Sequence, residues 1–356
     1  ILSTTESVAK REIIEMPNPD KIEIKQLDIE LNGGCNYKCN MCPQAHGREK
    51  DFLKKLPLST LEKILDDAVA YGLESVSIHG SGEPTLNQDM PDAVALVKER
   101  GLNCISFTNG YKLTELMSQR LIEAGIDILR VSAIGYNKES YQKWMSVDGF
   151  EMVRSNVKQF IQLNEKLGGE SEIHLHHLIT NSENLRFEID AYRSNWVNHT
   201  GALAEVWMMH NWSGGYEGPY ERKNMVAKGS QIRSCGRPFA DLLQVRAGGE
   251  GDRVAAVVAC CMVLGKDSSA ILGHLDSSSI SEVVASKPYE ELRAAHRESR
   301  FEDISYCKDC DQLFDYPPAL VWTNIPNRSY GQSKIHESID HRSAINELKD
   351  TISKFT

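Results

Sequence analysis

The sequence predicts an α/β protein built around a parallel sheet, because strand-like and helix-like segments alternate over residues 22–212. Six short segments rich in apolar and β-branched residues recur there, and apolar residues between them repeat with a helical period. Right-handed crossovers would make successive units curl in one direction. This order of elements fits either a partial barrel or an open doubly wound sheet. We expect strands at 24–31, 75–79, 103–108, 128–132, 172–180 and 204–210.

The helices are expected between these strands. Ser59 and Glu62 stand at the spacing of a capping box, and apolar residues then recur on one face of the segment that follows. Further helices are expected at 89–100, 114–124, 150–167 and 185–196. The polar residues 1–21 are expected to form an N-terminal extension, and residues 317–356 a tail without recognisable chemistry.

Composition narrows the class of protein. The chain has 356 residues, 41% of them hydrophobic, which is enough for one barrel-sized core and a smaller module. A net charge of −10 with both signs interspersed argues against nucleic acid as the main partner, because phosphate binding requires a basic face. The sequence has no apolar run long enough to span a membrane and no secretory signal at its start, so we expect a cytoplasmic protein.

Three cysteines follow the first predicted strand at C-x3-C-x2-C spacing: Cys35, Cys39 and Cys42. A [4Fe–4S] cluster held by three thiolates keeps one iron with an open position, where a substrate or cofactor can bind. The alternative is half of a zinc site, although zinc prefers paired C-x2-C units and a closed set of four ligands.

A glycine-rich loop follows the second predicted strand, with the sequence Gly80-Ser81-Gly82-Glu83-Pro84. Glycines let a backbone approach a ligand closely, and a carboxylate can accept hydrogen bonds from an ammonium group. Alone, such a loop would be an ordinary turn. Next to the cysteine motif, it indicates a cofactor site at one end of the sheet.

The cysteine spacing and this loop together resemble the signature of the radical S-adenosylmethionine (SAM) enzymes, although Met41 stands where that family usually has an aromatic residue. The resemblance implies a partial (βα)6 TIM-like barrel with its active site at the carboxyl ends of the strands. It also implies that Cys35, Cys39 and Cys42 hold a [4Fe–4S] cluster that binds SAM and cleaves it to a 5′-deoxyadenosyl radical. A flavodoxin or ferredoxin type of protein would supply the electron.

By the same resemblance, Gly80, Gly82 and Glu83 would hold the amino group of SAM. Asn109 and Ser132, at the ends of the third and fourth predicted strands, are candidates for its ribose and carboxylate. The simpler interpretations are that Asn109 begins an Asn-Gly turn and that Ser132 ends a strand.

The fifth predicted strand carries His174 and His176 on the same face. If that face looks into the barrel, these side chains can touch SAM or substrate. If it looks outward, they are surface polar residues.

A second module is expected after a linker at 213–234, with a β-hairpin and a helical segment near 280–297 inside residues 235–316. Its cysteines can hold a complete [4Fe–4S] cluster or a zinc ion. The module resembles a Twitch domain, the short form of the SPASM iron–sulfur module. The resemblance implies one auxiliary [4Fe–4S] cluster held by Cys235, Cys260, Cys307 and Cys310. Cys261 is the alternative to Cys260, since neighbours in a strand face opposite ways.

The leading functional hypothesis is a radical SAM oxidoreductase that takes hydrogen from a hydroxyl-bearing carbon of a sugar, cyclitol or similar small molecule. The auxiliary cluster would accept the second electron. One alternative is a peptide maturase, which often has an N-terminal leader-binding domain, whereas only 34 residues precede Cys35. Another is a carbohydrate epimerase in which the Cys261 thiol donates hydrogen. An iron–sulfur electron carrier is disfavoured, because a carrier has no use for an open iron. The substrate itself has no readable code in the sequence.

Overall fold

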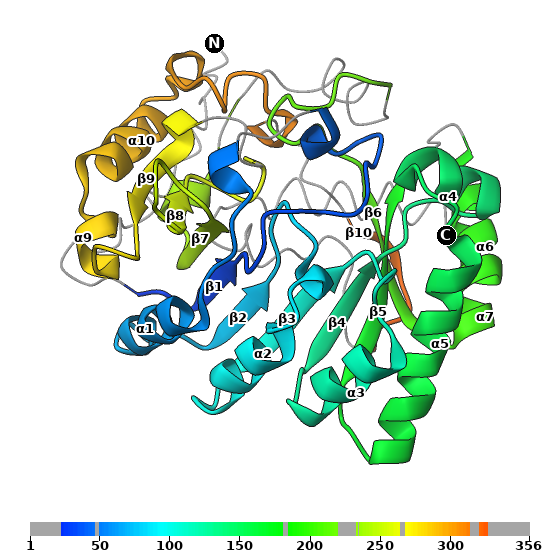
Figure 1. Ribbon diagram of the computed structural model, residues 1–356. Helices are drawn as coiled ribbons and strands as arrows, with labels where there is room; N and C mark the ends of the chain where they lie inside the picture. Colours follow the sequence, from blue (N-terminus) through cyan, green and yellow to red (C-terminus); the bar gives the residue numbers. More distant parts are fainter. Residues whose placement is uncertain are drawn as a thin grey trace, which may run out of the picture.

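The computed structural model describes residues 23–46, 50–180, 184–219, 233, 235–263, 268–313 and 320–326. The predicted extension at 1–21 lies outside these residues. The described chain forms one curved ten-stranded sheet in the order β10-β6-β5-β4-β3-β2-β1-β7-β8-β9 (Figure 1). Neighbouring strands from β1 to β6 are all parallel. This is the partial barrel that the sequence and its family resemblance predict.

All six predicted strands are present, and their ends differ from the expected ones by at most two residues. They are β1 Gln26–Ile29, β2 Ser75–Ile78, β3 Asn103–Thr108, β4 Ile128–Ser132, β5 Glu172–Ile179 and β6 Leu203–Met208.

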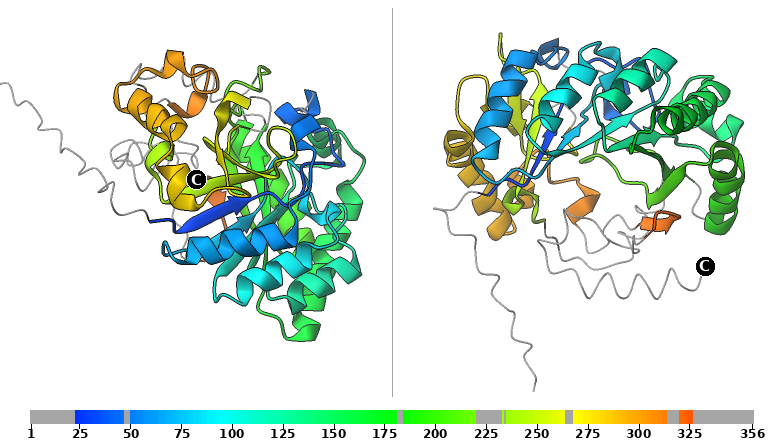
Figure 2. Two further views of the ribbon diagram at one scale, coloured as in Figure 1. Left: turned by 60° about the vertical axis from the view of Figure 1, so that its left-hand side comes forward. Right: turned by 90° about the horizontal axis from the view of Figure 1, so that it is seen from below.

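Helices cover the outer face of the curved sheet (Figure 2). Those after β1, β2, β3 and β4 bury apolar side chains such as Leu61, Val94 and Leu121, which confirms their helical periodicity. They include α1 Leu58–Val69, α2 Met90–Lys98, α3 Glu115–Glu123 and α5 Phe150–Leu167.

Three details of the helix prediction are wrong. Helix α1 has Pro57 as its N-cap and no side-chain cap, so Ser59 already lies in the first turn and forms no capping box. An additional helix, α4 (Lys138–Met145), follows β4, and the Asn137 side chain caps it by accepting a hydrogen bond from the Ser140 N–H at 2.8 Å. The segment predicted as one helix at 185–196 is α6 (Leu185–Tyr192) followed by a π-helical turn and the short α7 (Asn198–Thr200).

The second module continues the sheet of the barrel. Its hairpin is confirmed, with β7 (Leu242–Ala247) antiparallel to β8 (Ala255–Val258), and β7 pairs in parallel with β1. Strand β9 (Ile271–His274) follows, and the predicted helical segment is divided into α9 (Ile280–Val284) and α10 (Lys287–Arg297).

The predicted boundary of the tail needs a correction. Strand β10 (Leu320–Thr323) pairs antiparallel with β6, so residues 320–323 belong to the barrel sheet. Of the predicted linker at 213–234, only residues 213–219 and 233 are described. Within the described residues, no helix combines the length and the apolar character that a membrane crossing requires.

Alternation along the strands separates two environments. In β1, Leu27 and Ile29 are fully buried on the helix-covered side, and Asp28 lies on the opposite side. We call that side the inner face. The pairing register places the following residues on it: Asp28, Glu30, His79, Phe107, Arg130, His174, His176, Glu205, Gln244 and Arg246.

Candidate active site at the carboxyl ends of the strands

The three cysteines of the first motif lie in the loop that follows β1. This loop packs against the end of α4: the Asn40 N–H donates to the Trp144 carbonyl at 2.8 Å, and Cys39 Sγ lies 3.9 Å from Met145 Sδ. Burial raises the pKa of the Cys35 thiol to about 11, and the nearby Glu83 and Cys42 add to this increase.

The mutual influence of the thiols indicates what they can hold. Burial raises the pKa of Cys39 as well, and Cys42 and Cys35 raise it further, so a bound metal centre would favour the thiolate forms. Within the described residues, no three His, Cys, Asp or Glu side chains are placed to hold a single metal ion. In an iron–sulfur cluster each thiolate binds a different iron, so its sulfurs stand farther apart than around one zinc ion, where Zn–S is about 2.3 Å. Three neighbouring thiols are the donor set that a [4Fe–4S] cluster with one open iron position requires.

Glu83 connects the loop after β2 to the end of β3. Its Oε1 accepts hydrogen bonds from the Thr85 N–H at 3.0 Å and from the Thr85 and Thr108 hydroxyls, both at 2.6 Å. Its Oε2 accepts from the Asn109 N–H at 2.7 Å. Burial raises the pKa of Glu83, and these hydrogen bonds oppose the increase. A carboxylate offers about four lone-pair positions on two oxygens, so Oε2 retains one for a ligand ammonium group.

The glycines of this loop have a packing role that the sequence analysis did not foresee. A Cβ atom on Gly80 would lie 2.1 Å from Glu30 Oε2, and one on Gly82 would lie 1.7 Å from the Asn32 carbonyl oxygen. The loop can therefore approach the end of β1 only with glycine at both positions. A close approach to a ligand was our expected reason, and it stays a prediction.

Glu30 is a positioning residue that the sequence analysis missed. Its Oε2 accepts from the Ser81 N–H at 2.5 Å, the Ser81 hydroxyl at 2.9 Å and the Gly82 N–H at 3.2 Å. Its Oε1 accepts from the Ala247 N–H at 3.2 Å. One buried carboxylate thus holds the glycine-rich loop and β7 against β1. The available signal was a second acidic residue two positions after Asp28, on the same face of the predicted strand.

Asn109 lies beside both loops. Its Nδ2 donates to Asn36 Oδ1 at 2.8 Å, and its backbone N–H is the donor to Glu83. The Glu83 N–H in turn donates to the Gly34 carbonyl at 2.8 Å. The structure therefore brings together the cysteine loop, Glu83 and Asn109, as predicted. Ser132 is half-buried at the end of β4, opposite His176 in the sheet register. That Asn109 and Ser132 contact SAM stays a prediction.

His174 and His176 lie on the inner face, so the surface interpretation is wrong for both. His174 is buried, and its Nε2 lies 2.7 Å from Glu172 Oε2. Burial lowers the pKa of His176 to about 4, with Glu205 opposing the shift and Arg130 adding to it. His176 also meets the Phe107 ring edge-on, with 6.0 Å between ring centroids. Both imidazoles thus belong to a charged cluster inside the barrel.

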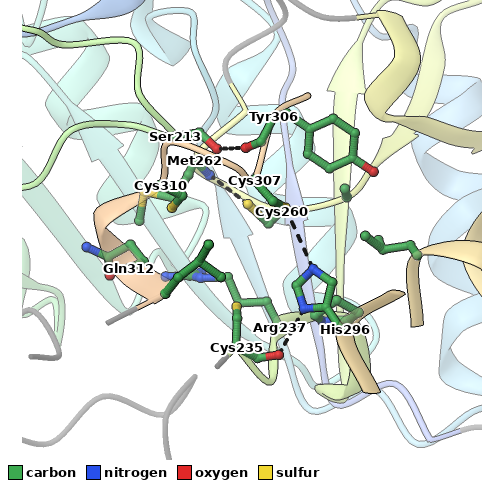
Figure 3. Close-up of a pocket in the computed structure, with 14 residues that line it drawn as sticks. Ser213, Cys235, Arg237, Cys260, Met262, His296, Tyr306, Cys307, Cys310 and Gln312 are labelled. Carbon is green, nitrogen blue, oxygen red and sulfur yellow. Dashed lines mark hydrogen bonds between the residues drawn. The ribbon is translucent and has the colours of Figure 1, made fainter. Parts of the chain in front are cut away.

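The second cysteine set lines a cavity of about 370 Å³, its open mouth included (Figure 3). Four cysteines contribute to the lining: Cys235, Cys260, Cys307 and Cys310. His296 is beside them, with its Nε2 3.7 Å from Cys307 Sγ and its Nδ1 3.1 Å from the Cys235 carbonyl oxygen.

Cys261 does not line this cavity. Its Sγ accepts a hydrogen bond from Arg237 Nη1 at 2.9 Å. Burial raises the pKa of Cys261 to about 11, Arg237 lowers it, and Asp28 of the inner face also acts on it. Both cysteines lie beyond the end of β8 at Val258, and of the two only Cys260 lines the cavity.

Arg237 supplies a cation to the second set. Burial lowers the pKa of its guanidinium, but the neighbouring cysteines, Cys261 first and then Cys260, produce a net increase. A buried cation beside four thiols compensates the negative charge of a thiolate-held cluster. The donor set and its surroundings fit an iron–sulfur cluster.

Comparisons with known proteins agree with this geometry. Residues 29–183 match the radical SAM superfamily, and residues 243–311 match SPASM, an iron–sulfur cluster-binding domain. A probable GTP 3′,8-cyclase of Methanococcus maripaludis (strain C5) is 29% identical over 141 residues, which are 40% of this chain and 47% of the relative. A probable GTP 3′,8-cyclase of Saccharolobus islandicus is 33% identical over 143 residues, or 39% of this chain and 44% of that protein. The alignments span about half the length of these curated relatives.

Solved structures with the same fold cover more of the chain. BtrN in complex with AdoMet and 2-DOIA aligns over 82% of this chain and 98% of its own, with 18% identity and a TM-score of 0.53. Streptococcus suis SuiB bound to the precursor peptide SuiA aligns over 77% and 67%, with 15% identity and a TM-score of 0.58. The cofactors that these two domains bind are SAM, the [4Fe–4S] cluster that binds SAM and an auxiliary iron–sulfur cluster. The chain thus belongs to the radical SAM superfamily, with a C-terminal SPASM/Twitch-type domain.

Proposed function

We propose that this radical SAM enzyme is an oxidoreductase that removes hydrogen from a hydroxyl-bearing carbon of a polar small molecule, such as a sugar or cyclitol. The observation that supports this is the inner face of the sheet, which carries buried charged side chains. Asp28 and Glu205 are 3% and 2% exposed, and Arg130 Nη2 lies 3.7 Å from Glu205 Oε1. Such groups recognise hydroxyl, amino and anionic groups of a polar substrate.

The metal and SAM ligands are assigned as follows. Cys35, Cys39 and Cys42 hold the cluster that binds SAM, and Glu83 accepts from the SAM ammonium group beside Gly80, Gly82, Asn109 and Ser132. Cys235, Cys260, Cys307 and Cys310 hold one auxiliary [4Fe–4S] cluster. The bound cofactors supply a 5′-deoxyadenosyl radical, which takes one hydrogen atom from the substrate carbon, and an acceptor for one electron.

The substrate radical must also lose the hydroxyl proton to become a carbonyl compound. His79 is the side chain that we assign to this transfer. Burial lowers its pKa, so the imidazole is neutral near pH 7 and can accept a proton. Its Nε2 lies 3.7 Å from Asp28 Oδ2, and that carboxylate stabilises the imidazolium once it forms. The balance is then complete: one hydrogen atom to the radical, one electron to the auxiliary cluster and one proton to His79.

A second candidate is an epimerase in which Cys261 donates a hydrogen atom to the substrate radical. Two observations favour it: Cys261 lies outside the four-cysteine cavity, and it is close enough to Asp28 for that carboxylate to affect its pKa. In this reaction the substrate carbon regains hydrogen from the thiol, and the resulting sulfur radical needs one electron and one proton to return to the thiol.

One experiment separates the two reactions. Anaerobically prepared, reduced protein is incubated with SAM and a panel of sugars and cyclitols in deuterated water, and products are analysed by mass spectrometry. We expect a carbonyl product without deuterium at an inverted centre, formed by both the wild type and Cys261→Ala. Cys104→Ala is the matched control, because Cys104 is a fully buried thiol elsewhere in the sheet. An inverted, deuterated product that disappears only in Cys261→Ala would replace the oxidoreductase by the epimerase.

A further inference from the structure

Arg246 is a buried cation on the inner face that the proposed reaction does not use. Strand β7 places Gln244 and Arg246 on the same side, because residues two apart in a strand share a face. The Gln244 side-chain amide donates to Asp28 Oδ2, which identifies that side as the inner face. Arg246 therefore points into the inner face, where its charge acts on His79 and Cys261.

The guanidinium of Arg246 is almost without partners. The residue is 1% exposed, and its single hydrogen bond among the described residues is a long one, from Nη2 to the Cys261 carbonyl oxygen at 3.4 Å. Its Nε and Nη1 have no hydrogen-bond acceptor there, and no ion pair of Arg246 is found among the described residues. Burying a charged group with unmet donors is strongly unfavourable. A protein retains such a group where a ligand satisfies it.

The nearest carboxylate in the sheet register does not serve this purpose. Glu30 follows Ile29, which pairs with Val245, so Glu30 and Arg246 are the next residues along the two paired strands. The two oxygens of Glu30, however, accept from Ser81, Gly82 and Ala247. Its charge is therefore held by the glycine-rich loop and by the backbone of β7. Arg246 keeps two nitrogens, Nε and Nη1, for another acceptor.

An unmet acceptor lies beside these donors. Gln244 is 4% exposed, and its Oε1 has no hydrogen-bond donor among the described residues. Residues two apart in a strand are separated by roughly 6.6 Å, so one small molecule can reach both side chains. A second guanidinium, that of Arg130, is stacked 5.3 Å from the Phe107 ring centroid on the same face. Both arginines are close enough to lower the pKa of His79, which lies between their strands.

We infer that the substrate carries an anionic oxygen group, a carboxylate or a phosphate, that Arg246 binds, beside a hydroxyl or amino group that donates to Gln244 Oε1. This inference rests on the proposed function, because it takes the inner face to be the substrate site. The guanidinium fork matches the two oxygens of a carboxylate or phosphate, and such charge-assisted pairs are the stronger hydrogen bonds.

Arg293 provides the contrast that a structural arginine would show. Its Nε donates to the Pro238 carbonyl at 3.0 Å and its Nη1 to the Val284 carbonyl at 2.8 Å. Removing this side chain leaves two carbonyl groups without donors, so Arg293→Met should lower the thermal midpoint. Removing Arg246 takes away an uncompensated charge, so Arg246→Met should leave the midpoint of the ligand-free protein unchanged or higher.

The test measures anion binding by the full chain with its clusters in place. Inorganic phosphate, glycolate and acetate are each titrated in a thermal-shift assay and by calorimetry, with wild type, Arg246→Met, Arg246→Lys, Gln244→Met and Arg293→Met. We expect the wild type to bind phosphate or a carboxylate, Arg246→Met to bind it roughly tenfold to a hundredfold more weakly, and Arg246→Lys to bind it with intermediate affinity. The affinity for phosphate compared with that for acetate shows whether the site prefers a phosphate or a carboxylate. Gln244→Met should lose any preference for glycolate over acetate, because glycolate adds the hydroxyl.

Three results would overturn the inference. The first is that the wild type binds no anion. The second is that Arg246→Met has a lower thermal midpoint but unchanged anion affinity, and the third is that Arg246→Met loses as much affinity for SAM as for the anion. The last result would assign Arg246 to the carboxylate of SAM. The assay needs no turnover, so its result is independent of whether an oxidised product is ever found.

Discussion

The two cysteine sites differ in how the chain builds them. The first lies within residues 35–42, in a single loop. The second is collected from residues 235, 260, 307 and 310 around one cavity, with Arg237 and His296 in its wall. A site of three ligands beside the polar groups of Glu83 and Asn109 is suited to binding a cofactor. A site of four ligands enclosed by side chains is suited to electron transfer, because every ligand position on the metal is taken.

The largest effect should come from the first site. The triple variant Cys35→Ala, Cys39→Ala, Cys42→Ala removes every proposed ligand of the SAM-binding cluster. We expect SAM cleavage to be abolished and the iron content to fall from about eight to about four atoms per chain. Iron analysis and chromatography of 5′-deoxyadenosine measure both, with Cys104→Ala as the control. Retained cleavage in the triple variant would show that the first site is not the reactive one.

Breaking the second site should have a different consequence. Cys307→Ala removes one proposed auxiliary ligand, so the substrate radical has no electron acceptor, although the first site is intact. We expect slow formation of 5′-deoxyadenosine without oxidised product. The same chromatography and product analysis check this. If Cys307→Ala forms the oxidised product at the wild-type rate, the second site does not accept the electron.

A variant of Glu83 tests whether the first site binds SAM through this carboxylate. Glu83→Ala removes the acceptor that we assign to the SAM ammonium group, and it also leaves the donors of Thr85, Thr108 and Asn109 without a partner. We expect SAM to bind at least about tenfold more weakly and the free energy of unfolding to fall by about 1–3 kcal/mol, whereas the iron content should not change. Equilibrium dialysis and urea denaturation measure the two effects. Lower stability with unchanged SAM affinity would make Glu83 a purely structural residue.

The smallest effect concerns His176 on the inner face. Its pKa is lowered to about 4 in the folded protein, first by burial, so between its unfolded value near 6.5 and about 4 the unfolded chain binds a proton that the folded chain does not. Stability therefore falls as the pH decreases through this window. His176→Gln should remove about 2 kcal/mol of the stability loss between about pH 7.5 and about pH 5. Urea denaturation at both pH values measures it, and an equal loss in both proteins would contradict the assignment.

The local features of the fold were predictable because their causes are local. Alternation and helical periodicity located all six barrel strands and most helices, and the C-x3-C-x2-C spacing located the first cysteine site without reference to distant residues. The capping box at Ser59 failed because Pro57, with its extended backbone, already begins the helix. Helix α4 was missed although Asn137 and the residues after it carry a cap signal.

The sequence by itself determined the parallel α/β core, the two sets of cysteines and the loop that ends in Glu83. Only the tertiary structure decided which side chains meet across long separations. It separated Cys260 from Cys261, used Glu30 to hold the glycine-rich loop, and placed Arg246 on the inner face without an acceptor. The physical reason is the pairing of β7 with β1, which joins strands 216 residues apart, as in the contact of Gln244 with Asp28. Periodicity within a strand tells which residues share a face, but the partner strand determines what that face meets.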